Sequence, residues 1–365
     1  MIQIIKAGTL TTIQDAGRSG YQELGVPESG ALDSFSFKCS NLLVGNPENT
    51  PVLESVLFGP EVKFTEDTFI AITGADIGPM VNGDKVNLWE TLEINSGSIL
   101  SFSGPTGNGI RSYLSVSGGV RTEETELVMG SYSTYLPGGF GGHEGRALQD
   151  GDFVHVGKGD ANFAGGLSLK SPPHFADLET IRIIEGPQRD KFIESAIQTL
   201  TSNSYEVTPN SDRMGCRLDG PILEHLDRPD VISDGNAFGV IQVPGDGKPI
   251  ILLADRGTTG GYAKIATVIT ADRSKLAQLV PGAKINFEVV DQGKAVDLLR
   301  EQEKLLTSLS TDLSVPLKFR VEGVVVDAVG DDGRPLSATN FEKMEYSVTV
   351  SDGTMEYQVE LEISE

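Results

Sequence analysis

The chain has 365 residues and a formal net charge of −23 at neutral pH. Nucleic acids and anionic membranes bind basic surfaces, so this charge argues against both as partners. The charged fraction of 22% and the hydrophobic fraction of 38% are typical of a soluble folded protein, and the length favours two domains or one large domain with an appendage.

The cysteines and the N-terminus indicate a reducing compartment. Only Cys39 and Cys216 occur, and the four histidines lie apart from them, which leaves neither a disulfide framework nor zinc-binding spacing. Residues 1–6 have no apolar core long enough for a signal peptide, and no stretch approaches a membrane span. We therefore expect a cytoplasmic protein with no metal site.

Residues 8–33 are rich in glycine and in side chains that can form hydrogen bonds, with almost no apolar periodicity. Such a segment is either a tightly bonded structural loop or the wall of a polar pocket. We expect Gln14 and Asp15 to brace this loop. The residues expected to contact a ligand are Arg18, Ser29, Gly30 and Asp33.

Short runs rich in β-branched residues, bounded by Gly, Pro, Asn or Asp, predict strands along most of the chain. The clearest of these runs are residues 62–64, 69–73, 111–117, 181–184, 240–243 and 285–290. Helices are few, and the clearest candidates are residues 34–44, 188–200, 272–280 and 294–310. A faint similarity between residues 110–120 and 260–270 indicates two similar β-rich units, which we place at residues 1–160 and 174–295.

The end of the chain has a different composition. We expect a helix over residues 296–310 and then an acidic β extension over residues 311–365. This extension contains twelve acidic and four basic residues, and apolar residues alternate on either side of Ser351-Asp352-Gly353. That pattern predicts a β-hairpin packed against the body of the protein.

The second half carries most of the candidate site residues. Gln242 lies in an otherwise apolar strand, and burying a glutamine without a partner costs about 1–3 kcal/mol. Lys264 lies among Ala, Ile and Thr residues, where partial desolvation would suit it to proton transfer or to holding an anion. The alternative is an internal ion pair between Lys264 and Asp255. Arginines such as Arg213, if they face a cavity, favour a carboxylate or phosphate ligand.

The loop at residues 104–109 has the glycine spacing of a phosphate-binding loop, but Ile110 and Arg111 follow where lysine and serine or threonine are required. The sequence therefore predicts no ATP site in this chain.

Three stretches, residues 11–33, 41–54 and 241–266, carry a specific resemblance to a known family. The chain resembles the allophanate hydrolase subunit 2 family, also named 5-oxoprolinase component C or the biotin-dependent carboxyltransferase family. The resemblance covers about residues 1–295, and the usual Ala-Met-Asp of the family appears as Ala31-Leu32-Asp33. It implies a mainly β fold of two similar cyclophilin-like β-barrel units in tandem, with a few short helices besides the acidic extension.

The resemblance also implies a sister subunit 1 and a third subunit, which together with this chain would open 5-oxoproline to glutamate with ATP. For such a small amide or lactam, the residue types favour proton transfer by Asp33 or Asp255 and binding of carboxylate or phosphate oxygens by Arg18, Arg213 and Lys264. Ser29 and Gln242 would orient the amide. The full set of expected site residues is catalytic Lys264, Asp255 and Asp33, with Arg18, Ser29, Gly30, Arg213, Gln242 and Tyr262 binding the substrate.

Two alternatives stay open. The chain could be the carboxyltransferase component of a biotin-dependent urea or amide carboxylase, with biotin supplied in trans because the sequence has no Met-Lys-Met attachment site. The predicted hairpin of the extension is similar to the strand pair that often precedes a biotin carrier domain. The chain could instead be a non-enzymatic regulator that binds the sister subunit and antagonises a kinase inhibitor. Convergence of Arg18, Gln242 and Lys264 in one cavity would favour an enzyme.

Overall fold

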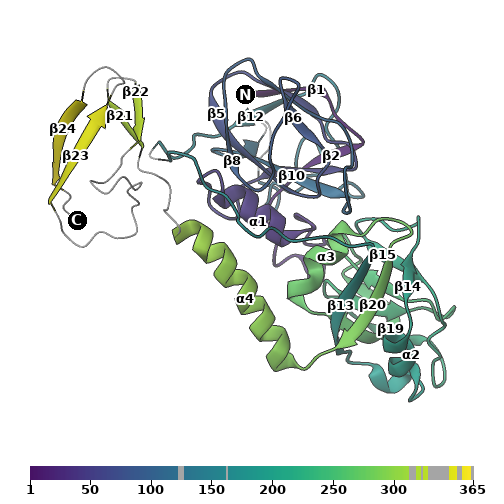
Figure 1. Cartoon of the computed structure of the whole chain (residues 1–365). Helices are drawn as coiled ribbons and strands as arrows, with labels where there is room; N and C mark the ends of the chain where they lie inside the picture. The colour runs from purple at the N-terminus through teal and green to yellow at the C-terminus, as the bar shows by residue number, and fades with distance from the viewer. Residues whose placement is uncertain are drawn as a thin grey trace.

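The computed structural model describes residues 1–121, 127–161, 163–311, 318–321, 324–327, 345–351 and 356–362. The fold is mainly β, which confirms the predicted class, and its body consists of two β units joined by a long connection (Figure 1). Within these described ranges, every helix is too short or too polar to cross a membrane.

The N-terminal unit consists of two sheets. The seven-stranded sheet has the order β11-β12-β1-β4-β9-β6-β7, and the five-stranded sheet has the order β2-β3-β10-β5-β8. Apolar side chains of both sheets, among them Ile4, Val62, Ile72 and Leu114, form one core. The strands are β1 (Ile2–Lys6), β2 (Leu10–Gln14), β3 (Val52–Val56), β4 (Glu61–Phe64), β5 (Thr68–Gly74), β6 (Pro79–Val81), β7 (Asp84–Lys85), β8 (Thr91–Ile94), β9 (Ile99–Phe102), β10 (Arg111–Val116), β11 (Val120–Arg121) and β12 (Phe153–Val156).

The C-terminal unit contains a closed barrel. Its strands follow the order β13-β20-β14-β15-β18-β17-β19, and an additional pairing of β19 with β13 closes the ring. An eighth strand, β16, also pairs with β19. A large apolar core fills this unit. The strands are β13 (Leu178–Glu185), β14 (Tyr205–Val207), β15 (Gly215–Asp219), β16 (Asp230–Gly235), β17 (Val240–Val243), β18 (Ile250–Leu252), β19 (Thr259–Val268) and β20 (Lys284–Val289).

Helix α1 (Ser34–Leu42) begins where Asp33 caps it. One carboxylate oxygen of Asp33 accepts a hydrogen bond from the backbone N of Ser36 at 3.0 Å and the other accepts one from its Oγ at 2.6 Å. Side-chain caps of this kind satisfy backbone donors at the start of a helix. The helix ends near Gly45, whose φ of +70° suits the left-handed turn there.

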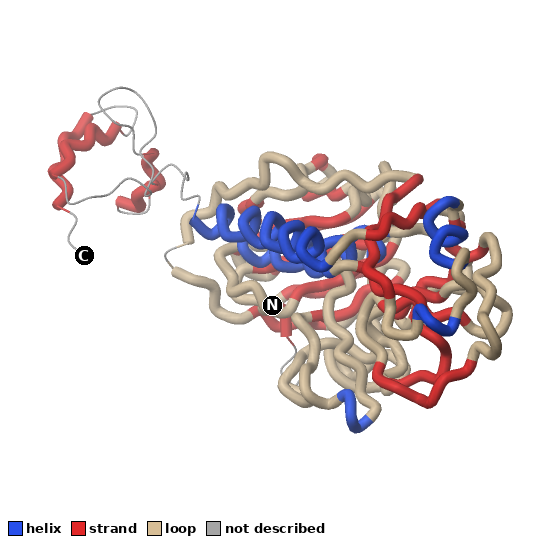
Figure 2. The backbone as a smooth tube through the Cα atoms, turned by 90° about the horizontal axis from the view of Figure 1, so that it is seen from below, coloured by secondary structure: helices blue, strands red, loops and turns tan. Residues whose placement is uncertain are grey.

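Helix α4 (Gln292–Thr311) follows the barrel and returns to the N-terminal unit, where it packs on α1 (Figures 1 and 2). Leu306 and Leu309 are buried in one cluster with Phe35, Cys39 and Leu43. The predicted helix at the end of the body is thus confirmed, and its apolar stripe ties the two units together.

The junction between the units also contains a polar contact through Gln278, the last residue of α3 (Arg273–Gln278). Its Nε2 donates to Oδ2 of Asp33 at 2.9 Å and to the carbonyl of Arg111 at 3.0 Å. Its Oε1 accepts from the backbone N of Ile110 and Arg111 at 3.1 and 2.9 Å. One buried amide side chain therefore forms four hydrogen bonds to the opposite unit.

The predicted helix over residues 188–200 is wrong in its first half. A 3-10 turn covers Arg189–Lys191, Phe192 is extended, and α2 (Ala196–Ser202) begins four residues later. Phe192 pairs with His225 through a β-bridge and a ring contact at 4.7 Å, and this distant partner overrides the local helical pattern.

The strand pairing predicted in the acidic extension is confirmed, but the predicted packing against the body is not, because these strands lie apart from the two β units in Figures 1 and 2. Strand β23 (Glu345–Ser351) pairs antiparallel with β24 (Glu356–Glu362), and β21 (Lys318–Val321) pairs with β22 (Val324–Asp327). The turn at 352–353 lies outside the described residues.

Candidate functional site

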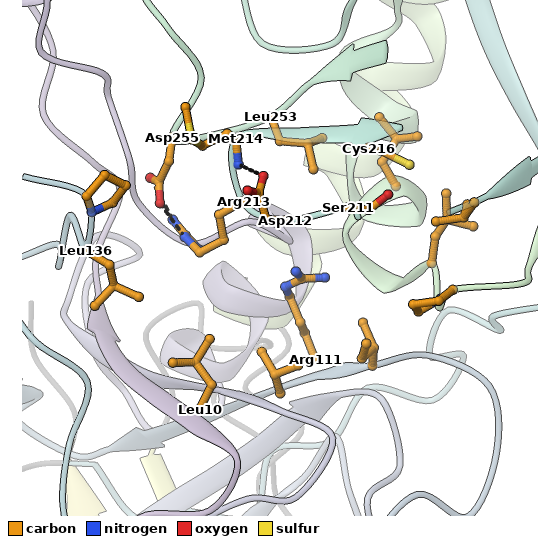
Figure 3. Close-up of a pocket in the computed structure, with 17 residues that line it drawn as sticks. Leu10, Arg111, Leu136, Ser211, Asp212, Arg213, Met214, Cys216, Leu253 and Asp255 are labelled. Atoms are coloured by element: carbon orange, nitrogen blue, oxygen red, sulfur yellow. Dashed lines mark hydrogen bonds and ion pairs between the residues drawn. The ribbon is translucent and has the colours of Figure 1, made fainter. Parts of the chain in front are cut away.

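A cavity of about 370 Å³ lies between the two β units (Figure 3). Both units contribute to its wall, which is mostly apolar but includes two arginines, two aspartates and a cysteine. The residues that line it are Leu10, Val56, Ile110, Arg111, Leu136, Pro137, Val207, Ser211, Asp212, Arg213, Met214, Cys216, Leu253, Asp255, Leu276, Leu279 and Pro281. We call it the junction cavity.

Arg213 is anchored on one side of the junction cavity. Its Nε donates to Oδ2 of Asp255 at 2.8 Å, its Nη1 to Oε1 of Glu54 at 2.6 Å, and its Nη2 to the carbonyl of Gly30 at 2.7 Å. Burial alone lowers the pKa of Arg213, but the charges of Glu54 and Asp255 outweigh it and the pKa is raised. Most of its donors are therefore used inside the protein, and Arg213 ties the glycine-rich loop to the barrel.

Glu54 extends this network into the N-terminal unit. Its Oε2 accepts from the hydroxyl of Tyr113 and from the backbone N of Leu32, both at 2.8 Å. The same hydroxyl accepts from the backbone N of Asp33 at 2.8 Å, and burial raises the pKa of Tyr113 well above its ordinary value. These contacts hold the C-terminal end of the glycine-rich loop in place.

Arg111 points toward the middle of the junction cavity, between Arg213 and Ser211 (Figure 3). Its Nη1 donates to the carbonyl of Ala277, while its buried Nε has no partner among the described residues. Burial lowers its pKa, although the negative charge of Glu54 opposes this effect. A partly buried cation with a spare, buried donor favours an anionic ligand. From the sequence, Arg111 was noted only because a phosphate-binding loop would have serine or threonine at its position, and no ligand-binding role was predicted for it.

The glycine loop before Arg111 does not fit a nucleotide phosphate. The backbone N–H groups of Ile110 and Arg111 already donate to Gln278, and an added Cβ on Gly109 would lie 2.8 Å from that of Ala75. Phosphate-binding loops present free backbone N–H groups. We therefore derive no step of a reaction through ATP on this loop.

Lys264 and Gln242 lie opposite each other on β19 and β17, next to a β-bulge. Both are buried. Nε2 of Gln242 donates to Oδ1 of Asn236 at 3.0 Å, and Nζ of Lys264 donates to Oδ2 of Asp234 at 3.4 Å. The alternative of an ion pair between Lys264 and Asp255 is wrong, because Asp255 pairs with Arg213 instead.

Asp234 is exposed, and its pKa is lowered mainly by the hydrogen bond from the backbone N–H of Gly235 and to a smaller extent by Lys264. Tyr262, on the same strand as Lys264, is 42% exposed. The structure thus brings Gln242, Lys264, Asn236 and Asp234 together at the outer edge of the barrel.

Arg18 belongs to a different network. It is buried, its Nη2 donates to the carbonyl of Ser133, and its guanidinium lies 5.0 Å from the ring centre of Phe140. Its Nε and Nη1 have no partner within the described residues, and burial lowers its pKa. No contact joins it to Gln242 or Lys264 in the described part of the chain.

The bracing role expected of Asp15 is confirmed. Its carboxylate accepts hydrogen bonds from the hydroxyls of Ser131 and Ser133 at 2.6 and 2.5 Å and from the backbone N of Tyr132 at 2.6 Å. Gln14 is also buried and donates to the carbonyl of Thr134 at 3.2 Å. These contacts hold the first part of the glycine-rich loop.

The other candidates of this loop lie at the unit junction. Ser29 has a φ of +55°, its backbone N donates to the carbonyl of Ala254 at 3.2 Å, and its buried Oγ has no partner in the described chain. Gly30 also has a positive φ, and an added Cβ would lie 2.9 Å from the backbone N of Gly17. Asp33 is fully buried in its capping role, and burial raises its pKa.

Comparison with known proteins identifies the family. Residues 24–289 match the family model described as carboxyltransferase domain, subdomain A and B. The chain belongs to this carboxyltransferase family. It is 36% identical over 310 residues to component C of the Escherichia coli 5-oxoprolinase, a match that covers 85% of this chain and 98% of that protein. The family resemblance seen in the sequence is thus confirmed.

Larger proteins contain a similar region. The urea amidolyase of Saccharomyces cerevisiae is 32% identical over 330 residues, which cover 84% of this chain and 18% of that protein. The crystal structure of the K. lactis urea amidolyase has a TM-score of 0.79 and 28% identity, covering 96% of this chain and 22% of that one. This chain therefore corresponds to about a fifth of the urea amidolyases, and its relatives are components of enzymes.

Proposed function

We propose that this chain is component C of a cytoplasmic 5-oxoprolinase, which acts with a sister subunit and a third subunit to open 5-oxoproline to glutamate at the expense of ATP. The observation that carries the proposal is the match with component C of the E. coli 5-oxoprolinase. It covers nearly all of that protein and 85% of this chain. ATP would bind to the partner subunits, since the glycine loop of this chain does not fit a phosphate.

Within this function, Lys264 and Gln242 are the residues proposed to act on the lactam. Lys264 is a buried cation whose carboxylate partner, Asp234, lies 3.4 Å away and is itself exposed. An ammonium group in this setting can stabilise an oxyanion that develops on an amide carbonyl. Gln242 and its neighbour Asn236 offer amide groups that can pair with a lactam. Asp255 and Arg213 pair with each other, and the carboxylate of Asp33 is bound by Ser36 and Gln278, which supports a positioning role for all three.

The test is reconstitution with the proteins encoded beside this chain, followed by measurement of ATP-dependent glutamate release from 5-oxoproline. Lys264→Met should lower turnover about 100-fold or more if Lys264 stabilises the oxyanion. Lys248→Met is the matched control, because Lys248 lies at the surface and pairs with exposed Asp219. Turnover that is unchanged by Lys264→Met would refute the role of Lys264, and a wild-type complex that releases no glutamate would refute the function.

A second candidate is a biotin-dependent carboxyltransferase acting on urea or a related amide. The observation that favours it is the match with the K. lactis urea amidolyase structure, which covers 96% of this chain. A match of that length must include part of the acidic extension after residue 310. Biotin would come from a partner. Turnover of urea with bicarbonate and ATP, abolished by avidin, would support this candidate.

The reconstitution also tests the regulatory alternative. The separation of Arg18 from Gln242 and Lys264 is the arrangement that this alternative expects. A complex that keeps full turnover after this chain is left out would favour the regulator.

A further inference from the structure

A second cavity, also of about 370 Å³, has a wall that meets that of the junction cavity in sequence at residues 255 and 256. Leu253 and Asp255 line the junction cavity, whereas Arg256, the next residue, lines the second one. Both units contribute residues to its wall. The lining residues are Gln22, Glu28, Gly235, Asn236, Ala237, Phe238, Arg256 and Arg273.

Arg256 is fixed in the wall of this second cavity. It is 2% exposed, and its Nε donates to the carbonyl of Asn236 at 2.9 Å and its Nη1 to that of Leu253 at 3.2 Å. Its Nη2 donates to Oε2 of Glu28 at 2.9 Å. Glu28 is 40% exposed, so the cavity opens to solvent on the side of the glycine-rich loop.

Arg273 is the less satisfied of the two cations. Its Nη2 donates to the carbonyl of Phe238 at 3.0 Å, and its buried Nε has no acceptor among the described residues. It forms no ion pair within the described part of the chain. Its pKa is lowered by burial and by the nearby positive charge of Arg256. The ring of Phe238 supports its guanidinium at 4.9 Å.

The charges of the second cavity define the ligand that would complete it. Two guanidinium groups face a single carboxylate, that of Glu28, so one positive charge stays uncompensated. A ligand with one negative charge would balance it, whereas a doubly charged phosphate would leave an excess negative charge beside Glu28. The amides of Gln22 and Asn236 line the same space, and amide groups pair with a ligand that carries its own amide.

We propose that the second cavity binds the carboxylate of 5-oxoproline, with Arg273 as the principal anion-binding residue and Gln22 and Asn236 facing the lactam. The identity of the ligand rests on the proposed function. Asn236 also accepts the hydrogen bond from Gln242, so a lactam held here lies next to the cluster that contains Lys264. The site thus links recognition of the carboxylate to the residues proposed to act on the ring.

Isothermal titration of the full chain tests this site without turnover. We expect 5-oxoproline to bind, and 2-pyrrolidinone, which has the same ring without the carboxylate, to bind at least tenfold more weakly. Arg273→Met should weaken 5-oxoproline binding at least tenfold, because charge-assisted hydrogen bonds are lost. Arg300→Met is the control, since Arg300 is exposed on α4 and pairs only with Asp297 in the described structure. Gln22→Leu, a change in the short 3-10 helix Gln22–Leu24, should also weaken binding. It keeps the test valid if the Arg273→Met protein does not fold.

The outcomes separate the site from the function. If 5-oxoproline binds equally to the wild type, Arg273→Met and Gln22→Leu proteins, the proposed site is wrong. It is also wrong if inorganic phosphate binds to the chain and 5-oxoproline does not. Absence of 5-oxoproline binding to both the isolated chain and the reconstituted complex would also overturn it. Glutamate release in the reconstituted complex decides the proposed function independently of these titrations.

Discussion

At the scale of single residues, Cys216 shows how burial can keep a reactive group inert. Its thiol lines the junction cavity, and burial raises its pKa to about 12 although Ser211 and Arg111 act in the opposite direction. Only the thiolate is a nucleophile. A cysteine in the wall of a cavity is therefore a poor candidate for covalent catalysis in this protein.

We expect the folded protein to resist alkylation at pH 8. About one Cys216 side chain in ten thousand is a thiolate there, four pH units below its pKa. The rate of modification by iodoacetamide, followed by mass spectrometry, should rise about tenfold per pH unit above 8 while the protein stays folded. In urea both cysteines should react rapidly. Fast modification of folded protein at pH 8 would contradict the raised pKa.

Individual residues were predictable where their role is local. Asp15 was expected to brace its loop, and it accepts hydrogen bonds from three residues of one segment. Arg111 and Arg273 were not predicted as site residues. Each has an Nε without a hydrogen-bond acceptor among the described residues, and this depends on how distant segments pack around it, which the local sequence does not show. The partner of Lys264 was misassigned for the same reason, since Asp255 is nearer in sequence to Lys264 than Asp234 is and yet pairs with Arg213.

At the scale of elements, α4 contributes to stability through one stripe of its surface. Leu306 is buried against α1, whereas its neighbour Leu305 is 39% exposed. Leu306→Ala should lower the free energy of unfolding by about 2–4 kcal/mol, since it removes buried methyl groups and leaves a cavity. Urea denaturation monitored by circular dichroism measures this change.

Leu305→Ala is the control for this prediction, with an expected loss within about 1 kcal/mol because the side chain is largely in solvent. Equal effects of the two substitutions would show that α4 does not pack on α1 in solution.

The helix α4 and the hairpin of β23 and β24 were predictable because each is encoded by a continuous periodic pattern. The interrupted region at Phe192 was not, since its partner His225 lies on a distant loop. Closure of the barrel through β13 and β19 likewise depends on a pairing of strands separated by most of the unit. Local patterns predict elements, whereas contacts between distant segments decide how those elements are interrupted and closed.

At the scale of the whole molecule, Gln278 joins the two units with a single side chain. Gln278→Leu has a similar size but removes the four hydrogen bonds and leaves the backbone N–H groups of Ile110 and Arg111 without their acceptor, while Asp33 keeps its bonds from Ser36. We expect a loss of about 3 kcal/mol or more, because each buried polar group left without a partner costs about 1–3 kcal/mol. Calorimetry should show a lower transition temperature.

The exposed Gln198 of α2 provides the control, and Gln198→Leu should leave the transition nearly unchanged. A Gln278→Leu protein that unfolds at the wild-type temperature would mean that the junction does not depend on this residue. The two cavities were not predictable from sequence, because their walls combine residues from both units that are far apart in the chain.

The packing of α4 on α1 has a consequence for synthesis of the chain. Phe35, Cys39 and Leu43 leave the ribosome early, but Leu306 and Leu309, which complete their apolar cluster, follow more than 260 residues later. At roughly 5–20 residues per second, this surface stays partly uncovered for some tens of seconds. We therefore expect a chaperone to be most useful during this interval, when the apolar surface of α1 on the nascent N-terminal unit is not yet covered by α4.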